Sequence, residues 1–288
     1  MWKEHFRTGV DIIDDQHKEL FDKTGVLLRG VNDSVENNRD LCISTIQFLK
    51  DYAISHFAYE EKLLQSVEYA DFAEHKTQHE KFLQSVMNYE QKMIETDFGA
   101  KYVREFTGML ATWLIYHVAD VDVRYVEYMR GVEHSTRAAA RSHKDMVRNG
   151  VVTTLNMMAG LEEQSFAFVD IYDADGGDYV SVEVGLTGDI SGYIAYVYPV
   201  PFIKNLIYAL MSYTPDDIGD MELSALFELT NIISGNICNQ MSKAESKLCD
   251  IKPPSIADMS IIEPDEKFYL DTGIGVIETD LAVEYLAA

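Results

Sequence analysis

The stretch FAEHKTQHEKF, residues 72–82, places His75 four residues before His79. On an α-helix, side chains four residues apart lie on the same face, one turn above the other. Two imidazoles that project from one face can hold a single metal ion, because histidine is a common ligand for iron, zinc and copper. The stretch therefore predicts a metal ligand pair, provided that its surroundings are helical and supply further ligands.

The surrounding sequence predicts a helical bundle. From residue 9 to residue 133 the chain contains no proline, and its apolar residues recur at helical spacing, beginning with Ile12, Ile13, Leu20, Phe21, Val26, Leu27 and Leu28. Breaks rich in Asn and Asp divide the region into helices over residues 14–35, 39–66, 70–95 and 99–130. Connections this short join antiparallel neighbours, so we expect an all-α, up-down-up-down four-helix bundle.

The second predicted helix carries a similar pair, because SHFAYEEKLLQS, residues 55–66, places His56 four residues before Glu60. A single pair of this kind is usually an ion pair on a helix surface. Here two pairs lie on neighbouring helices, and the first and fourth helices add His17 and His117. Each helix thus brings at least one histidine to a common interior, which favours a centre for two metal ions with bridging carboxylates.

Residues 1–133 resemble a bacterial hemerythrin domain. The segments that carry the resemblance are GVDIIDDQHKEL, HFAYEE, FAEHKTQHEKF and WLIYHVADVD, in that family's order and spacing. The resemblance implies a non-haem di-iron centre that binds O2 reversibly at an open position on one iron. It also implies the ligands, which are His75, His79 and His117 for one iron, His17 and His56 for the other, and Glu60 and Asp122 as bridges.

One interval does not fit a regular helix. His117 and Asp122 are five residues apart, which corresponds to about 140° of rotation, whereas Asp120 would lie nearer the same face. The resemblance nevertheless selects Asp122, so we expect a wide local turn or a flexible reach, and a solvated or supporting role for Asp120. Residues that match no ligand position are expected on the surface (His5, His134 and His143) or in the core (Trp113 and Tyr116).

The second half of the chain mixes strands with helices. Helical patterns over residues 141–161, 201–213 and 220–243 alternate with strand-like runs over residues 165–174, 178–188, 191–200 and 267–287. This order predicts an α+β domain over residues 145–288. The basic segment HSTRAAARSHKDMVR breaks the acidic pattern and marks a connector at residues 134–144, which could continue as helix after the bundle at residues 1–133.

The last long helix of this domain, which includes MELSALFELTNIISGNICNQ, carries Ser224, Glu228 and Asn231 on one stripe. Such a stripe alone is usually a solvated helix face. With Pro254, however, the spacing is that of a motif in the CheX, CheC and FliY phosphatases of bacterial chemotaxis, and residues 145–288 resemble that family, most nearly CheX. The resemblance implies that the domain hydrolyses the phospho-aspartate of a CheY-like response regulator.

The resemblance also implies roles for the motif residues. The amide of Asn231 would orient the attacking water, and Glu228 would pair with a lysine of the regulator. Ser224 and Pro254 would support the motif or the docking of the regulator. The regulator itself would supply Mg²⁺, so the remaining task is to position a water molecule for in-line attack.

Composition excludes several other classes of function. The net charge of −24 leaves an acidic excess in both halves, which disfavours nucleic acid as a partner. No apolar run approaches the roughly 18 residues of a membrane span, and the first residues lack the apolar segment of a secretory signal. Three widely spaced cysteines argue against a disulfide framework. We therefore expect a cytoplasmic protein with no membrane partner.

Together the two resemblances predict an oxygen- or redox-sensing phosphatase that acts on a phosphorylated CheY-like response regulator. Two alternatives remain at this point. The protein could sequester the phosphorylated regulator without hydrolysing it, or it could simply carry O2, which would leave the second domain without a role. The sequence also leaves a homodimer open.

Overall fold

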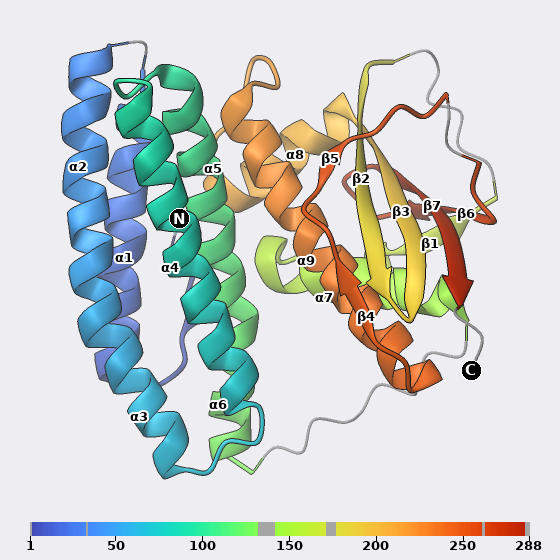
Figure 1. Cartoon of the computed structure of the whole chain (residues 1–288), viewed down its shortest axis with the longest axis horizontal. Coiled ribbons are helices and arrows are strands. Elements are labelled where there is room, and N and C mark those ends of the chain that lie inside the picture. The colour runs from blue at the N-terminus through green and yellow to red at the C-terminus, as the bar shows by residue number, and fades with distance from the viewer. Residues whose placement is uncertain (1, 33, 132–141, 171–176, 261–262, 286–288) are drawn as a thin grey trace. The chain divides into compact units, whose positions relative to one another are not determined.

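The computed structural model describes residues 2–32, 34–131, 142–170, 177–260 and 263–285. Residues 1–135 form the body of one compact unit, the bundle unit, and residues 136–218 with 225–288 form another, the sheet unit. An all-α half is followed by a half that mixes helices with a sheet, so the predicted fold class is confirmed (Figure 1). Among the described residues, no helix is long and apolar enough to cross a membrane.

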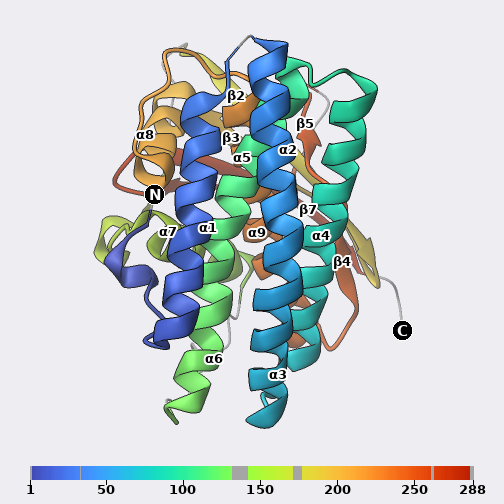
Figure 2. The ribbon, with the colours of Figure 1, turned by 90° about the vertical axis from the view of Figure 1, so that its left-hand side faces the viewer.

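Four helical rods make the bundle unit, after a short 3-10 turn at Glu4–Phe6 (Figure 2). The first rod is α1, Asp11–Gly30. The second consists of α2, η2 and α3, at Val35–Tyr52, Ala53–Phe57 and Ala58–Ser66. The third is α4, Phe72–Glu95, and the fourth consists of α5, η3 and α6, at Ala100–Tyr116, His117–Val121 and Asp122–Met129.

The first inter-helix turn lies earlier than the sequence pattern predicted. Helix α1 ends at Gly30 rather than at residue 35, and α2 begins at Val35 rather than at residue 39. The buried amide of Asn38 explains the shift, because it accepts from the backbone N–H of Asn32 at 3.1 Å and donates to the Asn32 carbonyl at 2.7 Å. Ser34 then caps α2, since its Oγ accepts from the backbone N–H of Asn37.

The bundle core is apolar and follows the helical pattern, with two exceptions. Its fully buried side chains come from all four rods and include Leu20, Phe21, Leu27, Leu49, Phe82, Phe106 and Leu110. Ile12 and Val26, which the pattern placed with the core residues, are each 49% exposed. They share an outer face of α1, so only part of the apolar pattern of this helix corresponds to burial.

The sheet unit contains one antiparallel sheet and three long helices. The strands are β1 Ala167–Val169, β2 Tyr179–Gly188, β3 Ile190–Pro199, β4 Cys249–Ile251, β5 Ser255–Ile256, β6 Glu266–Asp271 and β7 Val276–Tyr285. The helices are α7 His143–Ala159, α8 Val200–Met211 and α9 Asp220–Glu245, with a 3-10 turn, η4, at Glu163–Ser165. The sheet order is β1-β6-β7-β3-β2-β4, with β5 also paired to β2, and every pairing is antiparallel.

The short edge strands β4 and β5 were not predicted from the sequence, because two or three residues show no clear alternation. Helices α7 and α9 lie close together, since a Cβ at Gly150 would meet Ile237 Cγ1 at 2.6 Å. Helix α9 in turn packs on β3, where the hydroxyl of Tyr196 contacts Ser234 Oγ at 2.9 Å and the hydroxyl of Tyr198 contacts Thr230 Oγ1 at 3.0 Å.

Helices α6 and α7 are separate. Gly131, just after α6, has a positive φ of 68°, and Ser142 is extended and caps α7 by accepting from the Asp145 backbone N–H. The predicted connector therefore does not continue as one helix into α7. Its residues 134–141 lie outside the described part of the chain.

Candidate metal centre and candidate docking helix

A widened turn brings His117 and Asp122 together. Residues His117–Val121 form a π-helical turn, η3, in which hydrogen bonds span five residues instead of four. This turn absorbs the extra rotation of a five-residue interval, so His117 Nε2 lies 3.2 Å from Asp122 Oδ1. The wide local turn expected from the sequence is therefore present.

A second π-helical turn, η2 at Ala53–Phe57, contains His56 and was not predicted. It lies immediately before α3, which carries Glu60, and His56 Nε2 is 3.8 Å from Glu60 Oε2. Such turns insert one residue into a helix and change which side chains face the bundle interior. Two of the four rods therefore depart from α-helical geometry at a predicted ligand.

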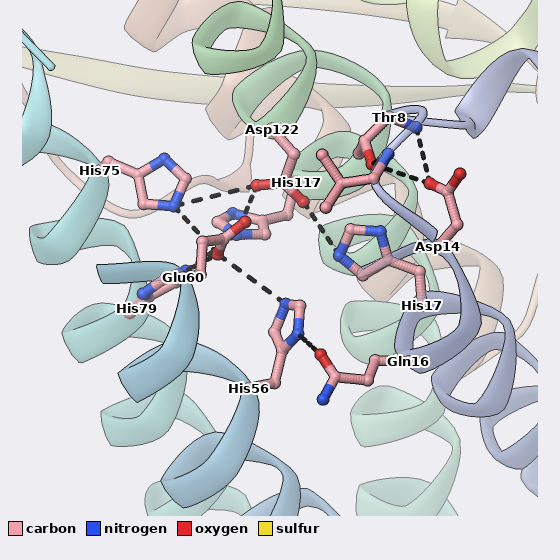
Figure 3. Close-up of polar contacts among 11 residues, drawn as sticks. Thr8, Asp14, Gln16, His17, His56, Glu60, His75, His79, His117 and Asp122 are labelled. Atoms are coloured by element: carbon pink, nitrogen blue, oxygen red, sulfur yellow. Dashed lines mark hydrogen bonds and ion pairs between the residues drawn. The ribbon is translucent and has the colours of Figure 1, made fainter. Parts of the chain in front are cut away.

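Seven buried side chains from all four rods converge on one place inside the bundle unit (Figure 3). Each is at most 2% exposed, and they are His17, His56, Glu60, His75, His79, His117 and Asp122. Two groups among them bring ligand atoms within 4.8 Å of one another, namely Glu60 with His75, His79 and His117, and Glu60 with His17 and His56. The structure thus gathers every residue that the resemblance named as an iron ligand.

The two carboxylates lie between the two sets of histidines. Glu60 Oε2 is 3.2 Å from His75 Nε2 and 3.3 Å from His79 Nε2, while the same oxygen faces His56. Asp122 Oδ2 is 3.2 Å from His17 Nε2, and its other oxygen faces His117. A carboxylate whose surroundings include ligands of both sets is suited to bridge two metal ions.

Several of these polar atoms have no hydrogen-bond partner within the described residues, although they are buried. They are Nε2 of His17 and of His56, Oε1 of Glu60, and both Oδ atoms of Asp122. A buried polar atom without a partner costs free energy. Cations at the centre would satisfy these atoms, and imidazole with carboxylate is a donor set that iron accepts. The residues therefore fit two iron ions.

Burial keeps the imidazoles in the form that binds metal. Desolvation lowers the pKa of His17 to about 4 and the pKa of His56 to about 3, and it lowers the pKa of His117 well below its usual value. Neutral imidazole has a free lone pair for a metal ion, whereas the protonated ring has none. At neutral pH these ligands need not lose a proton before a metal binds.

The pKa values of the two buried carboxyl groups, Glu60 and Asp122, are shifted in opposite directions. Burial acts to raise the pKa of Glu60, but hydrogen bonds from His75 and His79 outweigh it and hold the pKa well below the usual range. Burial, followed by the charge of Glu60, raises the pKa of Asp122 well above its usual range. In the absence of a cation, Asp122 therefore holds a proton more readily than Glu60. Metal ions would replace that proton.

Other side chains hold the predicted ligands in place. His56 Nδ1 lies 2.8 Å from Gln16 Oε1, and His79 Nδ1 lies 3.2 Å from Glu61 Oε1. The ring of Phe57 stacks on His79 at 3.8 Å. Hydrogen bonds to the far nitrogen of a ligating histidine set its tautomer and orientation. Neither Gln16 nor Glu61 was predicted, and the only local signal for each is that it directly adjoins a predicted ligand.

The residues that were predicted not to bind metal lie in different environments. Asp120 is 1% exposed and accepts from Arg124 Nε at 3.0 Å, so it is a buried support and not a solvated residue. Trp113 is buried in the core as expected, and its ring stacks on His117 at 4.4 Å. His143 lies outside the centre, and its Nε2 contacts the Tyr285 hydroxyl at 2.7 Å. The side chains of His5 and His134 lie outside the described part.

Helix α9 presents the second predicted group of residues. Ser224, Glu228 and Asn231 share one stripe of this helix, where Ser224 is buried and the other two are partly exposed. Pro254 lies off the helix, between β4 and β5. The contacts of Thr230 and Ser234 with β3 fix the rotation of α9 about its axis, and Asn231 lies about 100° around the helix from Thr230. Burial raises the pKa of the Glu228 carboxyl to about 7.

The first part of the chain is similar to hemerythrins. Residues 8–128 match the model of the hemerythrin HHE cation binding domain. A bacteriohemerythrin of Clostridium acetobutylicum is 33% identical over 130 residues, which cover 44% of this chain and 98% of that protein. The hemerythrin of Themiste dyscrita is 31% identical over 124 residues, which cover 43% of this chain and 88% of that protein.

The later part of the chain is similar to a different group. Residues 180–265 match the model of the chemotaxis phosphatase CheX, and this span contains the whole α9 motif with Pro254. A chain in the crystal structure of the CheX–CheY–BeF3–Mg²⁺ complex from Borrelia burgdorferi is 23% identical, with a TM-score of 0.41, and the match covers 50% of this chain and 99% of that chain.

Proposed function

Because the chain belongs to the hemerythrin family through its bundle unit, we propose that this unit binds two non-haem iron ions and O2, and that its CheX-like sheet unit hydrolyses the phospho-aspartate of a CheY-like response regulator. The protein is then an oxygen- or redox-sensing phosphatase. Its place is the cytoplasm, where response regulators are phosphorylated.

The convergence of seven buried ligand side chains carries the first half of the proposal. His75, His79 and His117 would hold one iron, and His17 and His56 the other, with Glu60 and Asp122 as bridges. When bound, the iron pair supplies reversible O2 binding. The protein contributes neutral imidazoles, two carboxylates between the sites, and a buried setting whose aromatic rings exclude water.

Iron analysis tests this half. The purified chain should contain about two iron ions, as the donor set predicts, and His79→Ala should reduce the content because it removes a buried ligand. His143→Ala is the matched control, since this histidine lies in the sheet unit and should leave the iron content unchanged. Equal iron in both variants would refute the ligand assignment.

The α9 motif within the CheX family match carries the second half. The regulator brings its phospho-aspartate and its own Mg²⁺, and the acyl phosphate is already a reactive mixed anhydride. The Asn231 amide can hold a water molecule in line with the phosphorus atom, so the contribution of this chain is orientation. Glu228 can pair with a lysine of the regulator, which would fix the docked position by charge.

Phosphate release from a phosphorylated regulator tests this half. Asn231→Ala should abolish the accelerated release and leave regulator binding intact, because the amide orients water and does not hold the partner. Asn239→Ala is the matched control, since Asn239 is an exposed asparagine on a different face of the same helix. If the wild-type chain binds the phosphorylated regulator but does not accelerate phosphate release, the sheet unit is a module that sequesters the regulator. If the chain neither binds the regulator nor releases phosphate, O2 carriage is the remaining function.

The sensing role is tested by the same assay on the iron-loaded chain. Release rates should differ between the reduced protein without O2 and the protein exposed to air. Identical rates in the two conditions, with both halves active, would mean that the iron centre does not control the phosphatase.

A further inference from the structure

The stripe of α9 that carries the motif continues beyond it. After Glu228 and Asn231, the same stripe includes Gly235, Cys238 and Ser242 at helical intervals. The first part of this stripe is the proposed docking face. The second part is covered by strand β4 of the same unit, and that contact brings two thiols together.

Two contacts place β4 along α9. A Cβ at Gly235 would meet Ile251 Cδ1 at 3.7 Å, and the backbone N–H of Cys249 donates to Ser242 Oγ at 3.0 Å. Because Ser242 lies one turn after Cys238, the strand runs back along the helix and Cys249 comes beside Cys238. Cys249 and Ile251 lie on the same face of β4, so both side chains face α9, and the Cys238 and Cys249 thiols influence each other's pKa. Both belong to the sheet unit.

The two thiols differ in reactivity. Interaction with the Cys238 thiol lowers the pKa of Cys249, and the same interaction, followed by burial, raises the pKa of Cys238. Cys249 is partly exposed, whereas Cys238 is 3% exposed. The thiolate is the form that reacts with oxidants. Cys249 is therefore placed to react first, and Cys238 is placed to attack the product.

We propose that Cys238 and Cys249 form a redox-active pair that hydrogen peroxide converts to a reversible disulfide. The Cys249 thiolate attacks one oxygen atom of the peroxide and the O–O bond breaks. Cys249 becomes a sulfenic acid, and hydroxide is released. The Cys238 thiol then displaces the new hydroxyl group, so the S–S bond forms and water leaves. The two thiols lose two electrons in total, and the peroxide is reduced to two water molecules.

The disulfide would fix the chain that leads to Pro254. Cys249 opens β4, and Pro254 follows this strand by three residues, while Cys238 lies two turns after Asn231 on α9. A bond between the two cysteines ties the Pro254 segment to the helix that bears the motif. Its effect on phosphate release rests on the proposed function, but the formation of the bond does not.

The test is a peroxide titration of the full-length, iron-loaded chain, followed by alkylation with N-ethylmaleimide and mass analysis. Reduced protein should take up three labels under denaturing conditions. Peroxide should leave one label, on Cys42, because burial in α2 raises the pKa of this thiol to about 12. Peptide mapping should find Cys238 joined to Cys249, and dithiothreitol should restore all three labels. Cys42→Ser should form the same bond.

Two further variants separate the roles of the pair. In Cys238→Ser, Cys249 should stop at the sulfenic acid and be trapped by dimedone, whereas in Cys249→Ser the buried Cys238 should stay reduced. The bond should also raise the melting midpoint of the sheet unit, because it closes a short loop in the unfolded chain. Equal loss of all three labels, a bond between two chains, or an unchanged midpoint would overturn the proposal. If the disulfide forms and no condition gives phosphate release, the proposed phosphatase fails and the redox pair stands.

Discussion

Asp14 holds the start of helix α1, which carries His17, and its replacement by asparagine should destabilise the bundle unit. Asp14 Oδ1 accepts from the backbone N–H of Thr8 at 2.7 Å and from the Thr8 hydroxyl at 2.8 Å, while Oδ2 accepts from the backbone N–H of Gly9 at 3.2 Å. The carboxylate is 1% exposed. Hydrogen bonds to a buried charge contribute roughly 1.5–3 kcal/mol each.

Asp14→Asn keeps one acceptor oxygen but loses the charge, and it turns an NH2 group toward the Gly9 N–H. We expect the free energy of unfolding of the bundle unit to fall by about 2 kcal/mol at pH 7, which corresponds to a decrease of about 6 °C in the melting midpoint for a unit of this size. Differential scanning calorimetry of the iron-free chain would follow this transition separately from that of the sheet unit.

The pH dependence gives a second readout. Burial alone would raise the pKa of Asp14, but the bonds from Thr8 and Gly9 outweigh it and lower the pKa. A depressed pKa means that the ionised group stabilises the fold above its unfolded value of about 3.9. The difference between wild type and Asp14→Asn should therefore be constant from pH 7 to pH 5 and shrink as the pH falls below about 4.

Asp15→Asn is the matched control. Asp15 is the next residue, its side chain is 79% exposed, and its pairing is with Lys18 at 3.8 Å. An exposed pair of this kind contributes less than about 1 kcal/mol. Equal losses of stability in Asp14→Asn and Asp15→Asn, or a loss in Asp14→Asn that persists unchanged at low pH, would show that the Asp14 carboxylate does not stabilise the bundle unit.

Three further outcomes are expected. Gln16→Leu should weaken iron binding by about 10- to 100-fold in a chelator competition, because it removes the acceptor that orients His56, whereas Gln47→Leu on the surface of α2 should not. Binding of the phosphorylated regulator, measured by titration calorimetry, should weaken as the pH falls below about 7, because Glu228 gains a proton there; Glu228→Gln should bind weakly at every pH. Tyr198→Phe should lower the free energy of unfolding of the sheet unit by about 1 kcal/mol in urea, because it removes a buried hydrogen bond to α9.

Tertiary contacts change the meaning of several residues whose local pattern was ambiguous. Asp120 and Asp122 are both acidic and both follow His117 closely, and only the π-helical turn at His117–Val121 directs the second one to the histidines. Asp120 instead pairs with Arg124. A helical wheel cannot show this difference, because the inserted residue changes the rotation for every residue after it.

Local sequence patterns were enough to predict the two-part organisation, the four helical rods and the candidate metal ligands, because helical periodicity and ligand spacing are local properties of the chain. The three-dimensional fold was needed to show which carboxylate oxygen faces which histidine, how the pKa of each buried carboxyl shifts, and which polar side chains support the ligands. It was also needed to show that β4 lies on α9 and brings Cys249 to Cys238. These features depend on contacts between residues far apart in the chain and on the loss of water around them. Neither the contacts nor the desolvation can be predicted from the spacing of residues in the sequence.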